Sequence, residues 1–136
     1  MDTTTHPDGP TIRGTVDRYI AGLESADFET VGNCFADDAF YSHPPFEPGG
    51  DRAEARGRTA ILELLRTRRK SRGWTHEITG FFSGEGRCVI ETRVREYAGG
   101  PVRSDSAGLG TFDAEGRITR WVAYRSDTMI GGTLTE

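Results

Sequence analysis

Hydrophobic residues recur every three or four positions in the first third of the chain, which is the spacing of amphipathic helices. A first helix is predicted to begin at a cap on Thr11. Its apolar stripe consists of Ile12, Val16, Tyr19, Ile20 and Leu23. Asp27 is the expected cap of a short second helix with Phe28, Val31 and Phe35 on one face. A third helix is predicted over residues 59–71, with Ile61, Leu62, Leu64 and Leu65 as its stripe.

The second half of the chain changes to strand-like composition. A short strand is expected at 39–43, followed by a Pro- and Gly-rich loop at 44–57. After Trp74, the turn signals SGEG, AGGP and DAEG separate runs rich in Val, Ile, Phe, Tyr and Thr. These predict antiparallel strands at 74–83, 87–97, 102–113 and 117–126. Helices followed by an antiparallel meander indicate an α+β fold with the helices packed on one face of the sheet.

Length and composition limit the possible classes of protein. The chain of 136 residues fits one domain, which we expect at 11–127 between polar tails at 1–10 and 128–136. A net charge of −4 argues against nucleic acid as a partner. No apolar run approaches the ~20 residues that span a bilayer, and no leader is recognisable, so we expect a cytoplasmic protein that does not bind membranes. Cys34 and Cys88 are expected to be reduced thiols, without a metal site.

The stretch CFADDAFYSHPPF places His43 between a serine and two prolines. Proline lacks a backbone donor and restricts the preceding residue to extended geometry, so His43 is expected at a strand end. Histidine is suited to proton transfer near neutral pH. A structural role for this histidine stays equally open.

The segments VDRYIAGLESADFETVGNCFADDAFYSHPPF, EARGRTAI and GTFDAEGRITRWVAYRSD resemble the NTF2-like superfamily, and within it the SnoaL-like and ketosteroid-isomerase-like proteins. The resemblance covers most of residues 11–127. It implies a cone in which three helices close one side of a strongly curved antiparallel sheet, with a mixed edge, around a pocket. It also implies a homodimer through the outer sheet face. This fold hosts enzymes and non-catalytic binders, so it does not define an activity.

The resemblance transfers some functional positions and not others. The helix-one tyrosine of the steroid isomerases falls on Tyr19, and their base falls on His43. Their second oxyanion acid falls on Gly108 and is lost, so steroid isomerisation is not expected. The epoxide-hydrolase pattern needs carboxylates at the positions of Arg95 and Ala123, and both are absent.

The remaining site prediction depends on strand register. The resemblance directs a set of polar and aromatic side chains towards the pocket as substrate-binding residues: Glu91, Arg93, Arg95, Ser104, Ser106, Trp121 and Arg125. Arginines in a partly dry pocket would favour a substrate with a carboxylate or phosphate. Alternation allows the opposite register, in which Ile90 and Val94 face the core and the charged residues form a solvated ladder.

The expected function is therefore a cofactor-independent and metal-free isomerase, epimerase or cyclase acting on a small anionic carbonyl compound, in specialised or amino-acid-derived metabolism. His43 would remove a proton next to the carbonyl, and Tyr19 would hold the enolate oxygen with help from Arg95 or Ser106. The alternatives are a non-catalytic binding or accessory protein and a dehydratase that uses the same histidine.

Overall fold

The computed structural model describes residues 5–45, 50–68 and 73–126 of the chain. Three helices and six strands form within these ranges. In chain order they are α1 (Gly9–Ser25), α2 (Phe28–Asn33), β1 (Phe35–His43), β2 (Ala53–Arg56), α3 (Arg58–Arg68), β3 (Thr75–Gly84), β4 (Arg87–Arg95), β5 (Val102–Phe112) and β6 (Ile118–Arg125).

The strands form one six-stranded sheet in the order β2-β1-β6-β5-β4-β3. β1 and β6 run parallel, while every other neighbouring pair is antiparallel. The predicted α+β class is confirmed, as is the antiparallel meander of the last four strands. The parallel pair lies in the interior of the sheet, however, and not at the edge where we expected the mixed pairing.

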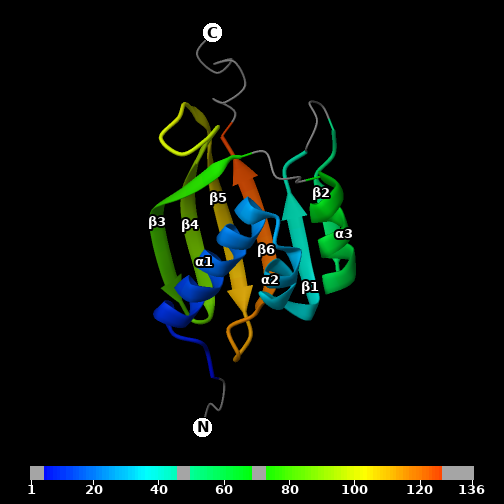
Figure 1. Ribbon diagram of the computed structural model, residues 1–136. Coiled ribbons are helices and arrows are strands. Elements are labelled where there is room, and N and C mark those ends of the chain that lie inside the picture. Colours follow the sequence, from blue (N-terminus) through cyan, green and yellow to red (C-terminus); the bar gives the residue numbers. More distant parts are fainter. Residues whose placement is uncertain (1–4, 46–49, 69–72, 127–136) are drawn as a thin grey trace.

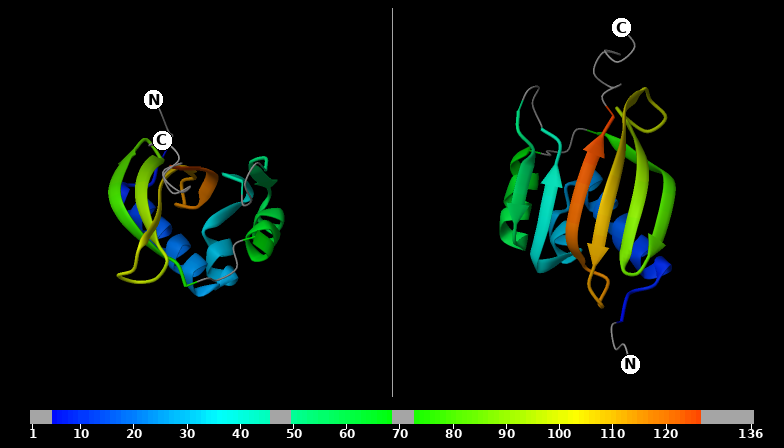
Figure 2. Two further views of the ribbon diagram at one scale, coloured as in Figure 1. Left: turned by 90° about the horizontal axis from the view of Figure 1, so that it is seen from above. Right: turned by 180° about the vertical axis from the view of Figure 1, so that it is seen from behind.

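Helices and sheet form two layers (Figure 1). α1 crosses one face of the sheet, and α3 lies beside β1 and β2. Seen from above, the sheet bends around the helices (Figure 2, left). We call the face covered by α1 the inner face and the opposite one the outer face. The core fills the inner face, with α1 and the strands both contributing side chains that include Val16, Tyr41, Ile90, Ile118 and Trp121.

The helix starts follow capping rules. The Asp8 carboxylate accepts the backbone N–H of Thr11 at 2.8 Å, so the cap of α1 is Asp8 and the predicted cap at Thr11 is wrong. α1 consequently begins inside the predicted 1–10 tail. Asp27 caps α2 as predicted, because its carboxylate accepts the N–H of Thr30 at 3.2 Å. Residues 1–4 and 128–136 of the predicted tails, and residues 69–71 of the predicted third helix, lie outside the described residues.

The structure extends β1 backwards and adds β2. β1 begins at Phe35, four residues before the prediction, because the Phe35 carbonyl accepts both Nε and Nη2 of Arg58 and the Cys34 carbonyl accepts the Ile118 N–H. β2 lies in the segment predicted as loop and pairs with the end of β1. The predicted hairpin turns contain Gly86 and Gly116, which both have positive φ angles (72° and 83°) that suit glycine.

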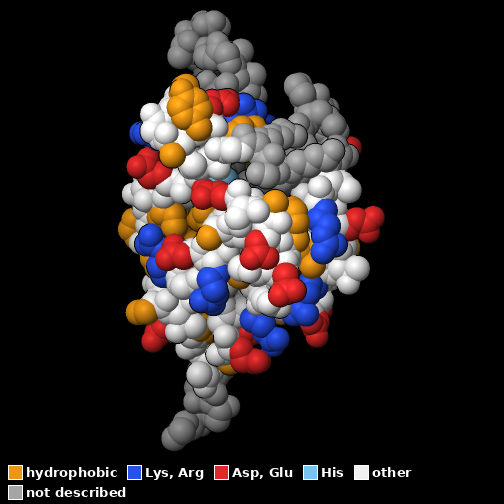
Figure 3. Space-filling view, viewed as in Figure 1, with side chains coloured by type: hydrophobic (Ala, Val, Ile, Leu, Met, Phe, Trp, Pro, Cys, Tyr) orange, Lys and Arg blue, Asp and Glu red, His pale blue; other side chains and the backbone are white. Residues whose placement is uncertain are grey.

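The helix-bearing face of the molecule carries acidic and basic side chains interspersed (Figure 3). None of the helices in the described ranges is both long and apolar enough to cross a membrane.

Candidate functional site

Residues from distant parts of the chain meet at one end of the sheet. Because β1 and β6 are parallel, their last residues, His43 and Arg125, lie at the same end of the sheet, where both arrowheads point in Figure 1. β1 is held there by α3 and β2 on one side and by β6 on the other. The topology therefore brings a histidine and an arginine from opposite halves of the sequence to one edge.

The strand register defines the inner face next to them. Ser106 pairs with Thr92 on one side and with Arg125 on the other, and Ser104 pairs with Val94. Since Ile90, on the same side of β4 as Thr92 and Val94, belongs to the core, these residues face inwards. Of the residues proposed from sequence, the inner face thus carries Tyr19, His43, Ser104, Ser106, Trp121 and Arg125.

His43 is half-buried and held in a defined orientation. Its Nδ1 lies 2.8 Å from the Pro44 carbonyl oxygen, and its ring stacks on Tyr41 with a centroid distance of 6.1 Å and an interplanar angle of 16°. A carbonyl only accepts hydrogen bonds, so Nδ1 carries the proton of the neutral ring and Nε2 is the nitrogen that can take another. The orienting partner is a backbone atom of the next residue, so side-chain patterns in the sequence could not reveal it.

Tyr19 extends from α1 into a set of aromatic rings on the inner face. Its ring is 5.6 Å from that of Phe35, edge-on, and 5.3 Å from that of Trp121. Phe35 in turn lies 6.3 Å from Tyr41, on which His43 stacks. Tyr19 is only 4% exposed. Aromatic contacts therefore connect the two predicted catalytic residues through well-packed neighbours.

Trp121 lies over two glycines of β5. A Cβ atom at Gly108 would lie 2.6 Å from Cζ2 of the indole, and one at Gly110 would lie 2.8 Å from Cζ3. The indole thus occupies the space next to Gly108, where the resemblance would place an oxyanion acid.

Three residues predicted to line the pocket lie on the outer face, so this part of the prediction is wrong. Arg93 pairs with Asp105 across the strands, with Nε 3.0 Å from Oδ1, and this hydrogen bond raises the pKa of Arg93. Arg95 lies 3.7 Å from Glu77 and donates to the Gly100 carbonyl. Glu91 is exposed on the same side. The apolar side of β4 determines the register: Ile90 and Val94 are buried, so the charged residues that alternate with them face solvent.

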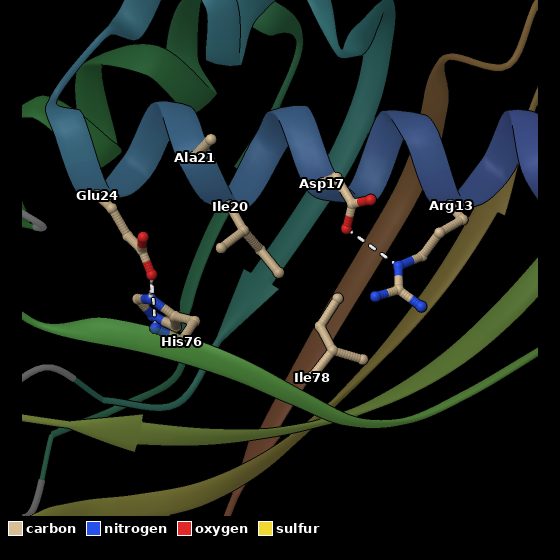
Figure 4. A pocket seen from close by; sticks show the side chains of 7 residues that line it. All are labelled: Arg13, Asp17, Ile20, Ala21, Glu24, His76 and Ile78. Carbon is tan, nitrogen blue, oxygen red and sulfur yellow. Dashed lines mark hydrogen bonds and ion pairs between the residues drawn. The ribbon is translucent and has the colours of Figure 1, made fainter. Parts of the chain in front are cut away.

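A groove that sequence reasoning missed lies between α1 and β3, the edge strand of the sheet (Figure 4). Its volume is about 230 Å³ and it is lined by Arg13, Asp17, Ile20, Ala21, Glu24, His76 and Ile78. Its charged groups pair with one another. Glu24 accepts from the backbone N–H and from Nδ1 of His76, the latter at 3.0 Å, and Arg13 lies 3.0 Å from Asp17.

The Glu24–His76 contact covers an edge of the sheet. Because β3 has a neighbour on one side only, the His76 N–H would otherwise point to solvent or to another chain. Glu24 satisfies this donor and attaches the strand to α1. The two residues are far apart in the sequence and belong to no motif, so no signal could have paired them.

The core contains two cysteine thiols, Cys34 and Cys88. Cys34 and Cys88 are buried free thiols, and burial raises the pKa of both, that of Cys88 to about 11. In the described part of the chain, no three His, Cys, Asp or Glu side chains gather so as to hold a metal ion.

Comparison with known proteins agrees with this architecture. The model of the SnoaL-like domain family matches residues 16–121, and the chain therefore belongs to that family. The chain is 29% identical to the epoxide hydrolase EphG of Mycobacterium tuberculosis over 110 residues, which are 80% of this chain and 69% of EphG.

Two solved structures share the fold. One is described as a candidate isomerase of the SnoaL-like family from Agrobacterium tumefaciens, with a TM-score of 0.69, 15% identity, and coverage of 86% of this chain and 98% of the other. The other is described as a candidate polyketide cyclase from Sinorhizobium meliloti, with a TM-score of 0.63, 21% identity, and coverage of 82% and 94%. The predicted membership of the NTF2-like group, with its SnoaL-like branch, is thereby confirmed.

Proposed function

We propose that the protein is a cofactor-independent isomerase, epimerase or cyclase that removes a proton next to a carbonyl group. The C–H bond of the substrate breaks, its proton moves to Nε2 of His43, and the electron pair forms an enolate. Return of the proton to another carbon, or to the other face of the same carbon, gives an isomer or epimer. Attack of the enolate carbon on an electrophile within the substrate gives a ring.

The observation that carries this proposal is the orientation of His43. The Pro44 carbonyl fixes the proton of the neutral ring on Nδ1 and makes Nε2 the basic nitrogen. Stacking on Tyr41 limits rotation of the ring. A base held in one tautomer and one orientation is what proton abstraction from carbon requires.

Tyr19 and Ser106 are the proposed donors to the enolate oxygen. Both are hydroxyl groups on the inner face, and a donor that is held in place before the reaction stabilises charge better than water does. Arg95, the other donor considered from sequence, is excluded from this role because it lies on the outer face and pairs with Glu77.

The test is deuterium exchange. The protein is incubated in D₂O with a panel of small 2-oxo and 3-oxo acids and ketones, and loss of the α-proton signal is followed by ¹H NMR. His43→Ala should slow exchange at least ~100-fold, the usual contribution of a general base. His6→Ala removes an exposed histidine that precedes α1, and it should leave the rate unchanged. Equal rates for His43→Ala and the unmodified protein would exclude His43 as the base.

A non-catalytic binding or accessory role is the second candidate, and the burial of Tyr19 favours it. A phenol only 4% exposed between Phe35 and Trp121 is suited to packing as well as to contact with substrate. This candidate predicts ligand binding that survives His43→Ala and no exchange in either protein. A dehydratase would instead release water from a hydroxylated substrate in a step that depends on His43.

Epoxide hydrolysis, the activity in the name of the M. tuberculosis relative, is less well supported. The epoxide-hydrolase pattern requires carboxylates that hold the attacking water. The corresponding positions are Arg95, which points to the outer face, and Ala123.

The proposal includes a homodimer formed through the outer face. Four of the large exposed hydrophobic residues of the chain lie there, and three of them form one row across adjacent strands, because Phe82 pairs with Val89 and Val89 pairs with Leu109. Tyr124 is exposed on the same face of β6. A continuous apolar row of this kind is typical of protein–protein contact surfaces.

A further inference from the structure

Arg125 differs from Arg93 and Arg95, the other arginines expected in the pocket, because no carboxylate among the described residues pairs with it and one of its donor atoms is buried without a partner. Its Nε is buried and has no hydrogen-bond partner. Within the described residues, its hydrogen bond runs from Nη1 to the Pro45 carbonyl at 3.4 Å, and none of the ion pairs there includes it. Arg93 and Arg95, by contrast, pair with Asp105 and Glu77.

An unpaired guanidinium in this position is costly. A buried donor without a partner loses the hydrogen bonds it would make to water, and the cost is larger for a charged group. Binding an anion would recover both the hydrogen bonds and the charge interaction. Because none of the described residues supplies such an anion, a ligand could fill this role.

The remaining edge of the guanidinium suits an anion with two oxygen atoms, and its charge favours a carboxylate. The bond to Pro45 uses Nη1, the nitrogen on the Cδ side, which leaves the Nε–Nη2 edge. This edge presents two parallel N–H groups, and a carboxylate accepts both at once. One positive charge matches the single negative charge of a carboxylate better than the two charges of a phosphate.

Arg125 and the proposed base are hydrogen-bonded to neighbouring residues of one loop. His43 donates to the Pro44 carbonyl and Arg125 to the Pro45 carbonyl, so both side chains are tied to consecutive peptide units. Consecutive Cα atoms are ~3.8 Å apart. Ser106, which faces Arg125 across the strands, adds a hydroxyl group at the same place.

We infer that Arg125 binds the carboxylate of the substrate through Nε and Nη2, and that the substrate is a small carbonyl compound whose carboxylate lies within a few bonds of the acidic carbon. The anion site stands on the geometry of Arg125 alone. Only the relation of the carboxylate to the reacting carbon rests on the proposed function.

The experiment follows the Nε–Hε signal of Arg125 by ¹H–¹⁵N NMR, assigned by its disappearance in Arg125→Gln. The probes are pyruvate, its neutral isostere pyruvamide, and inorganic phosphate. Pyruvate should shift the signal saturably, pyruvamide should not, and phosphate should bind more weakly than pyruvate.

Arg125→Gln should weaken pyruvate binding about tenfold or more, as expected for loss of a charge-assisted pair. Arg125→Lys keeps the charge but lacks the two parallel N–H groups. It should bind pyruvate more weakly than the unmodified protein and more tightly than Arg125→Gln. Arg93→Gln is the matched control and should bind pyruvate normally.

Three results would overturn the inference: an Nε–Hε signal unmoved by saturating pyruvate, equal shifts with pyruvate and pyruvamide, or binding to Arg125→Gln within twofold of the unmodified protein. Tighter binding of phosphate than of pyruvate would overturn the carboxylate assignment. His43→Ala separates this inference from the proposed function. It should abolish exchange while keeping pyruvate binding, so failure of the exchange test leaves the anion site standing, and failure of the anion test leaves the base standing.

Discussion

At the scale of single residues, Gly108 shows how closely the inner face is packed. The carbon atom of one added methyl group would lie 2.6 Å from the indole of Trp121 and 3.3 Å from Ile90. Indole and sheet are both rigid, so neither can move far without disturbing the aromatic contacts to Tyr19. The residue is fixed as glycine by its neighbours and not by a need for backbone freedom.

Gly108→Ala should therefore lower the free energy of unfolding by about 1–3 kcal/mol, the usual cost of overpacking. Urea denaturation followed by tryptophan fluorescence measures this change. Gly84→Ala is the matched control, because a Cβ atom there would meet nothing within 4 Å. Equal stability of the two variants would mean that Trp121 moves aside easily.

Cys88 makes a pH-dependent contribution to stability. Burial raises the pKa of its thiol from 9.0 to about 11, so the folded protein keeps the proton that the unfolded chain releases. This contribution is complete below pH 9 and is lost as the pH rises from about 9 to about 11. Cys88→Ala should show a shallower loss of stability across that window, by up to about 2 kcal/mol. Denaturation curves at pH 7, 9 and 10.5 test this, and parallel pH profiles would contradict it.

At the scale of elements, local chemistry predicted the cap of α2, although the predicted cap of α1 was wrong. Asp27 illustrates this: an acidic residue before an apolar run predicted α2, and its carboxylate accepts hydrogen bonds from the side chain and backbone of Thr30. These bonds lower the pKa of Asp27. The ionised cap therefore stabilises the fold above its ordinary pKa of 3.8, and this stabilisation is lost as the pH falls through the lowered value.

Asp27→Ala should reduce the Tm at pH 7, and the difference from the unmodified protein should shrink at pH 3. Asp27→Asn is the matched variant. It keeps an acceptor for the Thr30 N–H, so it should retain most of the stability at pH 7 while losing the pH dependence. Thermal circular dichroism at the two pH values measures both effects. A constant difference between Asp27→Ala and the unmodified protein would contradict the role assigned to the charge.

The elements were predictable where local chemistry determines them, and their mutual register was not. Periodicity found α1 and α3, and turn residues found the last four strands to within about two residues. β2 was missed because its sequence, AEAR, has neither an apolar face nor β-branched residues, and only its pairing with β1 makes it a strand. The orientation of Arg93 depended on which side of β4 packs against α1, and alternation alone leaves that choice open.

The site was predictable only in part for the same reason. The prolines after His43 indicated a strand end, and β1 does end at His43. The contacts that define the chemistry are made by backbone carbonyls and by strands that are distant in the sequence. That no described carboxylate pairs with Arg125 depends on residues from several elements, which no local motif records.

At the scale of the whole molecule, the outer face determines the proposed association. Phe82, Val89, Leu109 and Tyr124 are all at least 41% exposed. Burial of such a row against a second copy would remove apolar area from water, at roughly 25 cal/mol per Å².

Leu109→Glu should convert the proposed dimer to a monomer, because it introduces a charge into the apolar row. Sedimentation equilibrium over a range of protein concentrations measures the molecular mass. Ala21→Glu places the same charge on the exposed side of α1 and should leave the dimer intact. A monomeric unmodified protein at high concentration would rule out association through this face.

The parallel pairing of β1 with β6 has a consequence for how the chain folds during synthesis. β6 is the final strand and joins two half-sheets, β2–β1 and β5–β4–β3, that have no other strand contact with each other. Until Ile118–Arg125 leaves the ribosome, the first strand has no neighbour on that side, and such late, long-range closure slows folding. β6 therefore holds the two parts of the sheet together. A chain cut short before it would lose both the link between the two parts of the sheet and the strand that brings Arg125 to the same end of the sheet as His43.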